Sequence, residues 1–201
     1  PGIAGIMIIS GEELVYATSI ILFILSTIFT LLIKTNTQTI SKTPINLKNI
    51  FNGLEFVLKR QILVGAIGLD LFAVLLGGAT ALLPIFATDI LNVGSTGFGA
   101  LRATHMIGAL SGALILTQYP ITRFAGKSLL LSVGTFGLAI IIFGLSTYFW
   151  LSIAALFVIG SADSVSVFIR NNLVQIITPD HMRGRVSAVS AVFIGASNEL
   201  G

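Results

Sequence analysis

The sequence has few charged residues. Only 9% of its 201 residues are charged and 55% are hydrophobic, whereas about a quarter of the residues in a soluble domain are usually charged. So few charges cannot cover a water-facing surface. Several uncharged apolar runs also approach the roughly 20 residues that cross a bilayer. Together these observations exclude a soluble domain and predict an all-α polytopic membrane protein in contact with lipid.

The sequence also lacks cysteine, which excludes a disulfide framework and a thiolate metal site. Its two histidines, His105 and His181, are far apart in the chain, so we expect no metal site and no cofactor. No span combines histidine with acidic residues or a nucleophile with a base, so we expect no enzyme. The formal charge of +3 comes from residues scattered in loops, which argues against nucleic-acid binding.

Apolar runs of bilayer length define the predicted spans. The opening residues, Pro1 to Gly5, have no basic n-region, so we expect the chain to begin inside a helix rather than with a signal peptide. The candidate spans are a partial run at 1–9, complete runs at 14–33, 62–87, 97–117, 128–146 and 150–169 or slightly beyond, and a run from 186 onward.

The connections between these spans alternate in charge. The basic connections are 34–61, 118–127 and 178–185, and the positive-inside rule places them in the cytoplasm. Within the first, an apolar stripe with helical spacing predicts an amphipathic helix at about 47–60. We expect this helix to lie along the cytoplasmic headgroup boundary, although the same pattern fits a helix packed beneath the bundle. The stripe consists of Leu47, Ile50, Phe51, Leu54, Val57 and Leu58.

Small residues predict close packing of helices, because lipid provides no hydrophobic force between them. One set lies in the 97–117 span, and Gly134 and Gly137 lie in the next. Gly77, Gly78 and Pro84 indicate either a bend in the 62–87 span or simple packing. The first set consists of Gly99, Ala103, Gly108, Ser111 and Gly112.

Charged residues at membrane depth are expensive and are therefore candidates for function. From the rise of 1.5 Å per residue, Asp70 and Asp163 both lie about 10–12 Å from the cytoplasmic face. We expect the two carboxylates to line a water-filled cavity and exchange protons during transport, or else to join helices structurally. Arg170 lies seven residues after Asp163 and is expected to snorkel to the interface or to reach back to Asp163.

Further polar residues lie in the same spans. Arg102 and Glu199 are nearly level in the outer half, which predicts a pair used for transport or for structural cohesion. His105 can titrate near neutral pH or serve as a packing residue. Asn171 and Gln175 form either a gate or a solvated helix end.

Three motifs resemble segments of the major facilitator superfamily. Pro1 to Gly5 resembles the end of the helix 5 motif of exporters. Residues 123–127, Arg-Phe-Ala-Gly-Lys, resemble a degraded gating motif between helices 8 and 9, with Thr122 in place of its aspartate. Residues 170–175 and 178–186 resemble the helix 10 to 11 segment of the branch that exports enterobactin and macrolides.

This resemblance implies a central fragment of a twelve-helix bundle, from the end of helix 5 to the start of helix 11. Residues 1–33 would end the N-terminal bundle, 34–61 would be the cytoplasmic linker, and 62–201 would form most of the C-terminal bundle. Cytoplasmic gate contacts would come from Arg123, Lys127, Arg170, Asn171, Gln175, Arg183 and Arg185.

The implied function is secondary active transport by alternating access, in which two pseudo-symmetric bundles rock about a central site. We expect a multi-pass protein of the cytoplasmic membrane that works as a monomer and couples proton entry to export of a small amphiphilic molecule. The coupling candidates are Asp70, Asp163, Arg102, Glu199 and His105. The alternatives are an ion-coupled uptake permease and, in another class, a membrane-embedded enzyme.

Overall fold

The structure, a computed structural model, describes residues 12–33, 47–119, 121 and 124–200. Every regular element in these segments is a helix. The chain divides into two compact units, residues 1–44 and 45–201, and we describe each by itself. The all-helical architecture predicted from composition is therefore present in the described part of the chain.

The first unit contains one described helix, α2 (Glu12–Leu32). Its side chains are largely apolar, and its length and hydropathy suit a helix that crosses a membrane. The hydroxyls of Thr18 and Thr27 donate to the carbonyls of Leu14 and Phe23, at 2.7 and 2.8 Å. Each hydroxyl is thereby satisfied within the helix, so a bilayer need not supply a partner for it.

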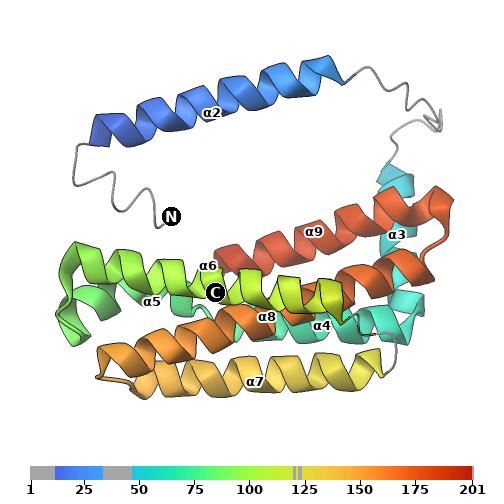
Figure 1. Ribbon diagram of the computed structural model, residues 1–201. Coiled ribbons are helices and arrows are strands. Elements are labelled where there is room, and N and C mark those ends of the chain that lie inside the picture. The colour runs from blue at the N-terminus through green and yellow to red at the C-terminus, as the bar shows by residue number, and fades with distance from the viewer. Residues whose placement is uncertain (1–11, 34–46, 120, 122–123, 201) are drawn as a thin grey trace. The chain divides into compact units, whose positions relative to one another are not determined.

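The second unit is a bundle in which α4, α6, α7 and α8 lie roughly along one another (Figure 1). α6 packs along α8, and α7 packs on another side of α8. The helices are α3 (Leu47–Lys59), α4 (Gln61–Leu76), α5 (Ala79–Ile85), a π-helical turn (Phe86–Ile90), α6 (Gly94–Gln118), α7 (Ala125–Leu145), α8 (Phe149–Ile177), a 3-10 turn (Asp180–Met182) and α9 (Arg183–Leu200).

Among the described residues, four helices are long and apolar enough to cross a membrane: α2 from Glu13, α6, α7 and α8. They match four of the predicted complete spans. The fifth, at 62–87, is not one continuous helix, because α4 ends at Leu76 and α5 begins at Ala79. Gly77 caps α4 with a hydrogen bond from its N–H to the Val74 carbonyl, 3.2 Å long.

Packing against α7 accounts for glycine at this break. A Cβ on Gly77 would lie 2.6 Å from Cδ1 of Ile140 and 2.8 Å from Cε1 of Phe136. Pro84 within α5 cannot donate a backbone hydrogen bond, and the π-helical turn follows it directly. Gly77, Gly78 and Pro84 thus mark a true interruption of this span, and its role as a moving hinge stays a prediction.

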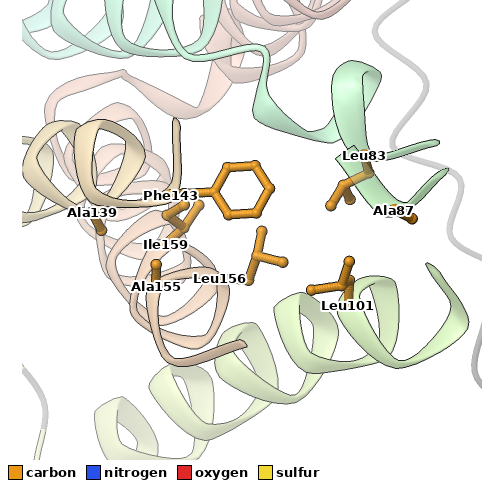
Figure 2. Packing of buried hydrophobic residues seen from close by; sticks show 8 residues of the cluster. All are labelled: Leu83, Ala87, Leu101, Ala139, Phe143, Ala155, Leu156 and Ile159. Atoms are coloured by element: carbon orange, nitrogen blue, oxygen red, sulfur yellow. The ribbon is translucent and has the colours of Figure 1, made fainter. Parts of the chain in front are cut away.

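The largest apolar core lies where α5, α6, α7 and α8 meet (Figure 2). The Phe143 ring points into the space between Leu83 and Leu156, with Leu101 on the adjoining helix (Figure 2). Phe143 also stacks on Phe86, with ring centroids 4.6 Å apart. This contact holds α7 against the π-helical turn that follows α5.

The amphipathic helix α3 packs against protein. Val57 is buried in a cluster with Leu63 of α4 and Val186 of α9. A Cβ on Gly53 would lie 3.1 Å from the Arg185 carbonyl oxygen, so the two backbones nearly touch. The helix therefore packs against α4 and α9, while Phe51 and Leu58 of the same stripe remain exposed. Its placement along the headgroup boundary stays a prediction.

Candidate functional site

One face of α8 carries three polar side chains at helical spacing. Asp163, Ser166 and Arg170 stand at positions i, i+3 and i+7, which brings them onto the same side of the helix. This side meets α4 and α7, since Asp163 and Ser166 line a cavity with residues of both helices. α8 has 29 residues and no proline, so it can hold these groups at fixed heights.

Arg170 pairs with Asp70 of α4. Its Nη1 contacts the carboxylate Oδ2 of Asp70, and the exposed fractions are only 2% for Arg170 and 4% for Asp70. Two buried charges are tolerated when they compensate one another. Both predicted arrangements for Arg170 are wrong, because the side chain neither snorkels to an interface nor pairs with Asp163.

Asp70 and Asp163 line the same small cavity, as their matched depths predicted. Its other walls are apolar apart from Ser166: Ala73 and Val74 come from α4, and Val133 and Phe136 come from α7. Asp163 is only partly buried, and no cation among the described residues lies within 4 Å of its carboxylate. The two carboxylates therefore differ, because Asp70 is neutralised by an arginine and Asp163 is not.

His105 lies on α6, which packs along α8, the helix that carries Asp163. Among the described residues, no ion pair joins His105 and Asp163 within 4 Å. The backbone at His105 is held close to α8, because a Cβ on Gly160 would overlap the His105 carbonyl oxygen. His105 therefore forms part of a tight helix contact, and its role in coupling stays a prediction.

Small residues form a seam between α6 and α8. A Cβ on Gly108 would overlap the Phe157 carbonyl, and one on Gly112 would lie 2.8 Å from the Ser161 carbonyl. The Ser161 hydroxyl donates to the Gly108 carbonyl at 3.0 Å. Gly108 and Gly112 were predicted as packing residues, whereas Gly160 and Ser161 on the facing helix were missed.

A groove of about 480 Å³ lies between α6, α7 and α8. Its walls are mainly apolar, with hydroxyls from Ser128, Thr135 and Ser161 and an exposed Tyr119 at one end. Such a surface suits the hydrocarbon part of an amphiphile or a lipid tail. Sequence reasoning missed this groove, because it depends on how three helices diverge.

The predicted cytoplasmic gate residues are mostly exposed. Lys127 lies over the Phe124 ring, 5.3 Å from its centroid, and Arg183 pairs with Asp180 at 2.9 Å. Arg185 lies against Gly53 of α3.

Asn171 and Gln175 are exposed near the end of α8. Arg123 lies outside the described residues, so its gate role remains an expectation from sequence.

The predicted pair of Arg102 and Glu199 stays a prediction. Arg102 is exposed on α6. Glu199 falls within α9, but its side chain lies outside what the structure describes. No group of three or more histidine, cysteine or acidic side chains within the described ranges could hold a metal ion.

Several apolar membrane-length helices, some of them packed through glycines beside a buried ion pair, define a multi-pass α-helical membrane protein. The family model described as "Transmembrane secretion effector" (MFS_3) matches residues 1–199. The chain belongs to this family of major facilitator transporters.

Curated relatives carry the name enterobactin exporter EntS. Those of Escherichia coli O139:H28 (strain E24377A / ETEC), Escherichia coli O157:H7 (strain EC4115 / EHEC) and Shigella boydii serotype 18 (strain CDC 3083-94 / BS512) are each 30% identical over 145 residues, or 71% of this chain. The matched segment covers 34% of each relative. No solved structure matches the chain.

Proposed function

We propose that the transporter containing this chain exports a small amphiphilic molecule of the siderophore or drug class across the cytoplasmic membrane, in exchange for protons. The family match and the similarity to enterobactin exporters support export. Transport would proceed by alternating access, with residues 62–201 supplying most of one rocking bundle and 1–33 the end of the other. The segment 34–61 would join the two bundles in the cytoplasm.

One observation carries the assignment of coupling to Asp163. This carboxylate lies at the edge of a cavity, partly accessible and without a cation within 4 Å among the described residues. Asp70, on the same cavity, is buried and neutralised by Arg170. A carboxyl group that is reachable and uncompensated can gain and lose a proton, whereas one that is buried in an ion pair is held in its charged form.

Proton flux in energised inverted membrane vesicles tests this function. Respiration acidifies the vesicle lumen, and a quenched dye reports the gradient while enterobactin or an amphiphilic drug is added. In vesicles with the full-length transporter, a transported compound should dissipate the gradient, since protons leave as the compound enters. Asp163→Asn should abolish this response. Asp89→Asn should not, because Asp89 is an exposed residue that accepts a hydrogen bond from Thr88, 2.7 Å long.

Two outcomes would contradict the proposal. If Asp163→Asn vesicles lose the gradient as wild type does, Asp163 is not the coupling group. If no compound alters the gradient but intact cells accumulate one of them through the transporter, the direction is uptake rather than export.

A further inference from the structure

Ser166 differs from two other buried serines on these helices, Ser132 and Ser197. Ser166 is 4% exposed, and its hydroxyl has no hydrogen-bond partner among the described residues. Ser132 and Ser197 instead donate to carbonyls three residues earlier, each at 2.9 Å. A buried hydroxyl without a partner has lost its hydrogen bonds to water without replacing them, so such a group calls for a function or a partner.

The position of Ser166 suggests what the hydroxyl serves. It lines the cavity shared by Asp70 and Asp163, and stands three residues after Asp163 and four before Arg170 on one helix face. The unsatisfied hydroxyl therefore lies at the cavity wall, between Asp163 and Arg170 along α8 and across from Asp70 of α4.

The chemistry of the lining leaves few alternatives for this link. The cavity residues contributed by α7, Val133 and Phe136, cannot form conventional hydrogen bonds, and neither can the side chains of Ala73 and Val74. A serine hydroxyl can donate to a charged carboxylate and accept from a protonated one. Ser166 is thus the cavity-lining group that can serve Asp163 in both of its protonation states.

We infer that Ser166 is a positioning residue that connects Asp163 to the Asp70–Arg170 pair across this cavity through a bridging water. The inference rests on the proposed role of Asp163 in proton coupling. When a proton joins the Asp163 carboxylate, an O–H bond forms there and the Ser166 hydroxyl changes from donor to acceptor. No covalent bond to Ser166 forms or breaks, and the local charge of Asp70, Arg170 and Asp163 rises from −1 to 0.

Through this link, protonation of Asp163 changes the electrostatic attraction within the Asp70–Arg170 pair. With Asp163 charged, two carboxylates share the field of one guanidinium, and with Asp163 neutral, Arg170 serves Asp70 alone. His105, on the neighbouring helix α6, is a further titratable group near this part of α8, since its carbonyl oxygen lies against Gly160. A proton that binds to Asp163 can thereby alter the contact between α4 and α8, although it does not bind to the Asp70–Arg170 pair itself.

Infrared spectroscopy of the purified full-length transporter in lipid bilayers tests the inference without a substrate. A protonated carboxyl gives a C=O band, and loss of a band in Asp163→Asn assigns it to Asp163. Ser166→Ala should move that band to higher frequency, because the carboxyl loses a hydrogen bond. Ser166→Thr, which keeps the hydroxyl, should restore it. Ser132→Ala is the matched control and should leave the band unchanged, since its hydroxyl bonds only to its own helix.

A second measurement examines the connection to the ion pair. Asp70→Asn should shift the titration midpoint of the Asp163 band, and the shift should shrink in a Ser166→Ala background. If Ser166→Ala leaves both the band and this shift as in wild type, the link is wrong, although Asp163 still titrates. If Asp163→Asn removes no band at any pH, the proposed coupling role fails, and the link fails with it.

Discussion

The two sides of α8 contact their neighbours in opposite ways. Toward α6, Gly108, Gly112 and Gly160 bring backbone against backbone, and the Ser161 hydroxyl is fully used. Toward α4, the contact is an ion pair beside a cavity, and the Ser166 hydroxyl is left unsatisfied. The first interface is close-packed and has one arrangement, whereas the second has room and unused donors. We therefore expect α6 and α8 to move as one body, with change occurring between α8 and α4.

Breaking the glycine seam should have the largest effect. In Gly160→Val, the new side chain would overlap the His105 carbonyl, a backbone atom that cannot swing away. Overpacking usually costs about 1–3 kcal/mol and occasionally more. Because the overlap here is with a backbone atom, we expect a loss above about 5 kcal/mol, seen as low expression and a lower melting temperature in detergent. Gly134→Val is the control, because nothing lies within 4 Å of a Cβ at Gly134. Equal stability of Gly160→Val and Gly134→Val would contradict close backbone packing between α6 and α8.

Separating the ion pair should have the next largest effect. Asp70→Asn or Arg170→Gln alone leaves one buried charge uncompensated, which costs about 3–5 kcal/mol. The double variant removes both charges and should regain most of that stability. Melting temperatures of the four proteins in a double-mutant cycle measure the coupling. Additive losses would mean that the two residues do not depend on one another.

A glycine contact away from α8 should respond more weakly. In Gly53→Ala, the added methyl would lie about 3.1 Å from Arg185 atoms of α9, a tight contact that the end of α3 can relieve by a small shift. We expect a loss of less than about 1 kcal/mol, measured as a small drop in melting temperature. Gly65→Ala in α4 has open space around it and is the control. If Gly53→Ala lost as much stability as Gly160→Val, α3 would be held against α9 as rigidly as α6 is held against α8.

The exposed ion pair of Glu55 and Lys59 should have the smallest effect. The Lys59 Nζ donates a hydrogen bond to the Glu55 Oε1, 2.5 Å away. This hydrogen bond and the positive charge of Lys59 lower the pKa of Glu55 below its ordinary value of 4.5. Because the pKa of Glu55 is lowered in the folded state, the charged carboxylate stabilises the protein at pH values above its ordinary pKa. This stabilisation is lost as the pH falls through the folded-state pKa. The melting temperature of Lys59→Gln should thus be slightly below wild type at neutral pH and equal to it in acid. A difference that grows in acid would contradict this sign.

The sequence predicted the helices well, because apolar runs of membrane length have few alternatives in lipid. It also placed Asp70 and Asp163 at one depth, since rise per residue fixes height along a helix. It did not find the Asp70–Arg170 pair, because height says nothing about rotation or about which helices are neighbours. The spacing of Asp163, Ser166 and Arg170 was visible in the sequence, but only the structure shows that this face of α8 meets Asp70 of α4.

Phe136 links two features that have been treated separately. Its ring packs where a side chain on Gly77 would be, at the break between α4 and α5, and it also forms a wall of the carboxylate cavity. A change of angle at the break would push or release this ring, and the volume open to water beside Asp163 would change with it. The same aromatic side chain would then convert bending of this span into wetting or drying of the cavity beside Asp163.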